Sequence, residues 1–69
     1  MQTSTSVREM MKRYVESNVP GFLGMRLPEM DNGRWRVYVS SFSGEGYFYV
    51  DGDRIERDSF TGFVRDKRS

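Results

Sequence analysis

The fold is decided by residues 34–54, which read RWRVYVSSFSGEGYFYVDGDR. Two runs in this stretch alternate apolar or aromatic residues with others, and a period of two is typical of β-strands. A glycine-rich segment separates the runs, so we expect two strands joined by a turn. The stretch holds the only Trp, three of the four Tyr and two of the five Phe. The other segments are therefore placed by the face of this ribbon that they cover.

A turn at Gly44-Glu45 sets the predicted pairing of the two strands. It places Val39 opposite Val50, Ser41 opposite Phe48, Ser40 opposite Tyr49, Phe42 opposite Tyr47 and Arg36 opposite Asp53. The sequence Val50-Asp51-Gly52-Asp53 then favours a second tight turn. The returning strand, Arg54 to Arg57, would bring Arg54 beside Tyr49 and Ile55 beside Phe48.

An amphipathic helix is predicted before the ribbon. Ser6 and Glu9 have the spacing of a capping box. An apolar stripe follows at helical spacing and consists of Val7, Met10, Met11, Tyr14 and Val15. Asn18 can end the helix, and Pro20 prevents its extension past Val19. Because so short a helix is not stable alone in water, we expect its stripe to cover the sheet.

A further strand is predicted over Phe22 to Leu27, and Pro28 ends it or places it at a sheet edge. Its alternation puts Leu23, Met25 and Leu27 on the core side. A tight Asn32-Gly33 turn would bring Leu27 opposite Tyr38, which is on the wrong face. We therefore expect a bulge or a longer loop between Leu27 and Trp35, or strands that are not direct neighbours.

These segments predict an α+β fold, with one N-terminal helix packed on a three- or four-stranded antiparallel β-meander. We expect a single small domain over residues 1–69, with flexible ends at 1–5 and 65–69. The predicted core is the helix stripe with the apolar sheet face, which comprises Leu23, Met25, Leu27, Trp35, Val37, Val39, Phe48, Val50 and Ile55.

The composition narrows the functional classes. The chain has 69 residues and a net charge of +1, so it has no strong field for nucleic acid or an anionic membrane. It has no Cys and no His, which removes thiol nucleophiles, the usual zinc ligands and the side chain that titrates near neutral pH. We expect no enzyme activity, no cofactor and no metal.

No apolar run reaches the roughly 18 residues of a membrane span. The missing cysteines favour a reducing compartment, so we expect a cytoplasmic location, or the envelope if the chain is an excised domain.

The outer sheet face is the candidate binding surface. Its predicted partner-binding residues are Arg36, Tyr38, Phe42, Tyr47, Tyr49 and Arg54, with Arg26 nearby on the same face. Aromatic residues on a face that is normally polar need an explanation. One is that residues 60–64 fold over them, and a second is self-association through this face or an edge strand. The third is recognition of another protein or of single-stranded nucleic acid, because Tyr and Arg serve both.

The order of these segments resembles a small PepSY-type domain. The resembling features are the helix over residues 7–15, Val19-Pro20-Gly21 leading into a strand, the segment Arg34 to Val39, and the segment Tyr47 to Gly52. The resemblance implies a helix-plus-sheet module that binds or inhibits peptidases and has no catalytic residues.

The prediction for function is a non-catalytic protein-binding or regulatory module that acts through the outer aromatic and arginine face or a sheet edge. The partner would be another protein or a second copy of this chain, as a homodimer. The alternative is a single-stranded nucleic-acid-binding protein that uses the same face.

Overall fold

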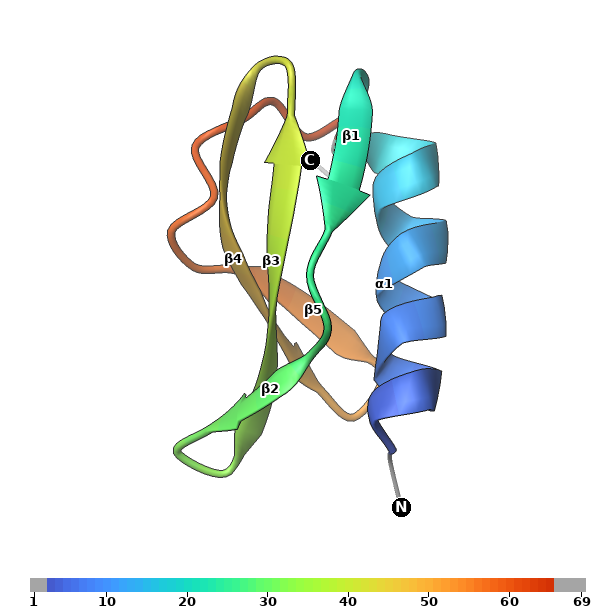
Figure 1. The fold of residues 1–69 in the computed structure, drawn as a ribbon, viewed down its shortest axis with the longest axis vertical. Coiled ribbons are helices and arrows are strands. Elements are labelled where there is room, and N and C mark those ends of the chain that lie inside the picture. The colour runs from blue at the N-terminus through green and yellow to red at the C-terminus, as the bar shows by residue number, and fades with distance from the viewer. Residues whose placement is uncertain (1–2, 66–69) are drawn as a thin grey trace.

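The computed structural model describes residues 3–65. The elements in chain order are α1 (Ser4–Asn18), β1 (Phe22–Met25), β2 (Glu29–Asp31), β3 (Arg34–Ser41), β4 (Gly44–Asp51) and β5 (Arg54–Arg57). The helix lies against one face of an antiparallel sheet (Figure 1). This confirms the predicted α+β class, with one short strand, β2, in addition to those expected. The flexible ends predicted from the sequence include residues 1–2 and 66–69, which lie outside the described residues.

Helix α1 begins one turn earlier than the sequence analysis placed it. Thr3 is the N-cap: its Oγ1 accepts from the Ser6 backbone N–H at 3.2 Å, and the Ser6 Oγ accepts from the Thr3 N–H at 3.0 Å. The predicted cap at Ser6 with Glu9 was wrong because Thr3 and Ser6 have the same spacing and add a helical turn. The predicted apolar stripe is confirmed. Three of its members are fully buried, and Met10 and Tyr14 pack against them.

The register of β3 and β4 differs from the prediction by four residues. Val39 lies opposite Gly46 rather than Val50, and the turn is Phe42-Ser43 rather than Gly44-Glu45. An even shift keeps every side chain on its predicted face, so the two faces survive the error. Phe42 is therefore not opposite Tyr47, and Arg36 lies opposite Tyr49 instead of Asp53.

The β3–β4 turn was predicted at the wrong position because Gly44 and Gly46 are needed for close packing and not for the turn. A Cβ built on Gly46 would collide with the backbone of Ser59 and Phe60, and one on Gly44 would lie 2.6 Å from the backbone N of Gly62. Both glycines sit inside β4, where the C-terminal segment crosses them. Glycine in a strand often marks such a close approach.

The turn between β4 and β5 is also displaced, by one position along the chain. It consists of Gly52-Asp53, and Gly52 has φ +66°, which suits glycine. Arg54 therefore lies opposite Asp51, and Tyr49 lies opposite Glu56, not Arg54. Ile55 lies opposite Val50 instead of Phe48 but stays on the predicted core face.

The edge formed by β1 and β2 contains both a tight turn and the bulge that the sequence led us to expect. Asn32-Gly33 makes the turn, with Asp31 opposite Arg34. Four steps separate Met25 from Glu29, but their partners Val39 and Arg36 are only three steps apart, so one residue is extra. The bulge thus lies before β2, in the irregular segment 26–28, instead of after Leu27.

A second register shift, between Phe22 and Gly24, corrects the predicted core. Leu23 is the extra residue there and is 60% exposed, while Phe22 packs against the core in its place. Leu27, in the irregular segment, is 76% exposed. The alternation rule failed for both leucines because each bulge inverts the pattern.

The C-terminal segment packs into the core and not over the outer face. Its backbone follows the free side of β4, where the Asp58 N–H donates to the Tyr47 carbonyl at 3.0 Å and the Thr61 N–H donates to the Glu45 carbonyl at 3.1 Å. Phe60 is 2% exposed, and its ring centroid lies 4.8 Å from that of Phe48. The explanation that residues 60–64 cover the aromatic residues of the outer face was therefore wrong. Across residues 3–65, no helix is long and apolar enough to cross a membrane.

Candidate binding face

Three tyrosines form the centre of the outer sheet face. Tyr38 of β3 lies directly opposite Tyr47 of β4, and their rings meet edge to face with centroids 5.2 Å apart. Tyr49 follows two residues along β4 and therefore shares the face with Tyr47. All three side chains are half-buried. Neither the helix nor Phe60 covers them, because both pack on the opposite side of the sheet.

An arginine stacks on each tyrosine ring. The guanidinium carbon of Arg34 lies 3.9 Å from the ring centroid of Tyr49, that of Arg36 lies 4.2 Å from Tyr47, and that of Arg26 lies 4.8 Å from Tyr38. A planar guanidinium over an aromatic face is attracted by the ring quadrupole. The face is thus an ordered layer of rings and cations.

Carboxylates of β2 and β5 neutralise two of these arginines. The Arg36 Nε lies 2.7 Å from the Glu29 Oε2, and the Arg34 Nη1 lies 3.7 Å from the Glu56 Oε1. The hydrogen bond that Arg36 donates to the Glu29 carboxylate is the main reason that the pKa of Arg36 is raised, so this group stays cationic. Both pairs are partly exposed, so each contributes little to stability by itself.

Tyr49 is held by a hydrogen bond as well as by stacking. Its hydroxyl donates to the Asp31 Oδ2 at 2.9 Å. That hydrogen bond, followed by burial, raises the pKa of Tyr49 above its usual value. The short strand β2 supplies both Glu29 and Asp31, so it anchors one end of the tyrosine and arginine layer.

The structure brings together four of the six predicted partner-binding residues: Arg36, Tyr38, Tyr47 and Tyr49. Phe42 is not part of this group, since it occupies the β3–β4 turn, is 83% exposed and packs beside Gly21. Arg54 lies at the start of β5, where its Nη2 is 3.4 Å from the Glu56 Oε2. The predicted register placed Phe42 opposite Tyr47 and Arg54 opposite Tyr49, and neither pairing occurs, although Arg54 stays on the outer face because the β4–β5 shift is even.

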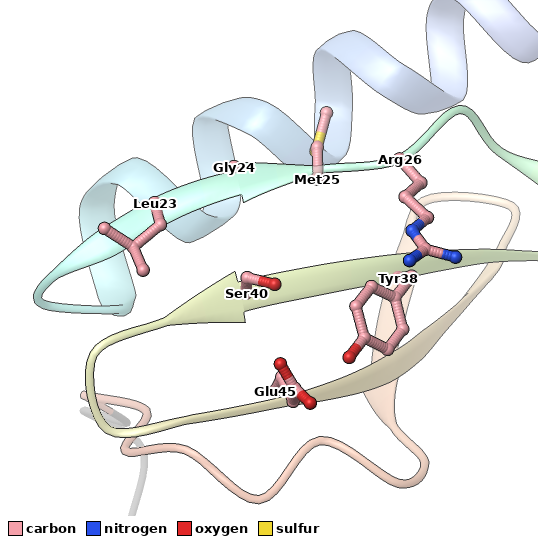
Figure 2. A pocket seen from close by; sticks show the side chains of 7 residues that line it. All are labelled: Leu23, Gly24, Met25, Arg26, Tyr38, Ser40 and Glu45. Carbon is pink, nitrogen blue, oxygen red and sulfur yellow. The ribbon is translucent and has the colours of Figure 1, made fainter.

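The outer face is hollowed at the end beyond Tyr38. Gly24 and Ser40 pair across β1 and β3, and neither has a large side chain. The hollow is lined by Leu23, Gly24, Met25, Arg26, Tyr38, Ser40 and Glu45 (Figure 2). The hollow was not predicted from the sequence. The available signal was Gly24 within a predicted strand, since such a glycine removes a side chain from the surface.

Arg26 and Glu45 give the hollow its charge. In Figure 2 the Tyr38 ring lies between their side chains. Burial, and then interaction with the Glu45 carboxylate, raise the pKa of Tyr38. Arg26 stacks on Tyr38 and is exposed, and within residues 3–65 no carboxylate lies in ion-pair range of it. The hollow therefore combines apolar contact from Leu23, hydroxyl groups, the Glu45 carboxylate and a cation that has no carboxylate in ion-pair range among the described residues.

The fold and this face define a two-layer α+β domain with an open sheet surface. No family model, curated protein or solved structure matches the chain. Among the described residues, 3–65, no group of three or more Asp or Glu side chains is placed to hold a metal ion.

Proposed function

We propose that the chain is a non-catalytic protein-binding module whose outer sheet face docks a segment of a partner protein. The observation that carries this proposal is the hollow over Gly24 and Ser40, which lies on the sheet face opposite the helix. Leu23 and the Tyr38 ring offer apolar contact there. Tyr and Arg residues of this kind often dominate binding energy at protein interfaces.

The sheet edges support the proposal less well than the face. The β1 edge is interrupted by a register shift at Leu23 and by the irregular segment 26–28, so it offers no regular row of backbone groups. The β5 edge is four residues long, and three of them are charged. Short and charged edges resist the addition of another strand.

Single-stranded nucleic acid is the weaker candidate for the same face. Bases bind such sheets by stacking on free aromatic rings. Here each of the three rings already carries a guanidinium, and the carboxylates of Glu29, Asp31 and Glu56 border the layer. These carboxylates would repel a phosphate backbone.

The resemblance to PepSY-type domains, the homodimeric form and the cytoplasmic location stay predictions. A peptidase, another protein or a second copy of this chain would each present a polypeptide segment to the hollow. The absence of His and Cys from the sequence supports a non-catalytic role, because general acid–base and nucleophilic catalysis most often use these residues.

Filling the hollow tests the proposal. The backbone of Gly24 has no positive φ and a Cβ there would have no atom within 4 Å, so the backbone tolerates Gly24→Leu, which adds a large side chain to the hollow. Peptides are first selected against the wild-type chain from a displayed random library, and their dissociation constants are measured by fluorescence anisotropy. We expect Gly24→Leu to weaken the selected peptides by at least about 10-fold.

Ser17→Leu is the matched control, since it adds the same side chain to an exposed position of α1. It should leave the dissociation constants unchanged. The proposal is wrong if no peptide is enriched above an unrelated protein of similar size, or if the selected peptides bind Gly24→Leu as tightly as the wild type.

A further inference from the structure

We infer that the hollow selects a partner segment in which an aspartate or glutamate side chain is flanked by aliphatic or aromatic residues. This inference rests on the proposed function, because it names the chemistry of the segment that docks there. Arg26 would bind the carboxylate, and the exposed Leu23 would contact a flanking apolar residue.

The charge of Arg26 is the first support. Three arginines stack on tyrosines of the outer face, and acidic partners lie within 4 Å of Arg34 and Arg36. Arg26 has none within the described residues 3–65 and lines the hollow. Its stacking on Tyr38 orders the guanidinium before a ligand arrives, so less side-chain entropy is lost when its donors engage a carboxylate.

The apolar residues beside Arg26 are the second support. Leu23 is 60% exposed and lines the hollow with Arg26, and Leu27, which is 76% exposed, follows Arg26 directly in the chain. An exposed apolar side chain in the same hollow as a cation fits a segment that carries both an acidic and an apolar side chain.

The lining of the hollow favours a carboxylate side chain over a phosphate group. Glu45 is the one acidic residue among the side chains that line it. Its carboxylate would repel a doubly charged phosphate more strongly than a singly charged carboxylate. The polar groups that line the hollow beside Arg26 are the hydroxyls of Ser40 and Tyr38, whereas capture of a chain terminus relies on a nest of backbone N–H groups.

The experiment uses the peptide that is enriched most by the wild-type chain. It is synthesised with an amidated C-terminus in three forms, with glutamate, glutamine or phosphoserine at the acidic position, and each form is titrated by fluorescence anisotropy. We expect enriched peptides to contain Asp or Glu beside an apolar residue. The glutamate form should bind the wild type about 10-fold more tightly than the glutamine form, as a charge-assisted hydrogen bond would give.

Substitutions in the protein locate that preference. Arg26→Gln should abolish the difference between the glutamate and glutamine forms, which is the coupling that a double-mutant cycle isolates. Arg26→Lys should retain part of it, because lysine keeps the charge but lacks the planar fork. Arg13→Gln removes one charge from the exposed side of α1 and should leave the difference intact.

Three results would overturn the inference while leaving the proposed function standing. The first is a set of peptides without acidic residues whose binding is still lost in Gly24→Leu. The second is tighter binding of the phosphoserine form than of the glutamate form. The third is a preference for glutamate that persists in Arg26→Gln. Failure to enrich any peptide would instead contradict the proposed function itself.

Discussion

Tyr49 shows how a single outer-face residue connects stability with pH. Its hydroxyl donates to Asp31, and this hydrogen bond raises the pKa of Tyr49 in the folded chain. An unfolded tyrosine loses its proton near about pH 10. Above that pH the folded chain binds more protons than the unfolded chain, so the free energy of unfolding must fall as pH rises.

Replacement of this hydroxyl should reduce the alkaline sensitivity. We expect Tyr49→Phe to lose less stability than the wild type between about pH 9 and about pH 11, because one group with a raised pKa is gone. Urea unfolding followed by circular dichroism at each pH measures the effect. The pKa of Tyr38 is also raised, so the free energy of unfolding of Tyr49→Phe should still fall somewhat as pH rises. An identical slope in Tyr49→Phe would show that the Asp31 hydrogen bond does not govern it.

At the level of the elements, the faces were predictable and the turns were not. The apolar stripe of α1 and the alternation of β3 and β4 assign a side to each residue, and an even error in register leaves that side unchanged. The turn positions were predicted wrongly because glycine occurs both in turns and where another backbone segment approaches closely. Gly44 and Gly46 have the composition of a hairpin turn, but their missing side chains admit the backbone of residues 59–62. Nothing local in the sequence separates these two uses.

Substitution of Gly46 tests the packing of the C-terminal segment on β4. A Cβ at this position would collide with backbone atoms of Ser59 and Phe60, which cannot rotate away, and the φ of +148° is unfavourable for other residues. We expect Gly46→Ala to lower the free energy of unfolding by at least about 2 kcal/mol. Chemical denaturation measures it.

Gly24→Ala is the control within the same sheet, because its Cβ would meet no atom within 4 Å. It should leave the free energy of unfolding within about 0.5 kcal/mol of wild type or raise it slightly. Equal effects of the two substitutions would contradict the close approach of the C-terminal segment to β4.

For the molecule as a whole, the predictable part of the site was the set of rings on one sheet face. The hollow was not predictable, since it depends on the pairing of Gly24 with Ser40, and that pairing follows from a register shift at Leu23. The sheet face that the C-terminal segment covers could not be predicted either. Phe60, Phe63 and Val64 could cover either face on composition alone, and contact with Phe48 and the small residues of β4 decides the matter.

The two faces of the sheet therefore have different roles. One sheet face, with α1 and Phe60, forms the core. The other face carries ordered tyrosines and arginines beside an open hollow. Exposed apolar side chains also occur at the β3–β4 turn next to the hollow, where Phe42 precedes Ser43 and the Phe63 N–H donates to the Ser43 Oγ. These two regions are the competing surfaces for a partner.

Backbone amide chemical-shift mapping, with a library-selected peptide titrated into the labelled chain, tests the central claim most directly. We expect the largest shifts around the hollow, at Leu23, Arg26, Ser40 and Glu45. Shifts that gather instead at Phe42 and Phe63, or along the exposed side of α1, would contradict it.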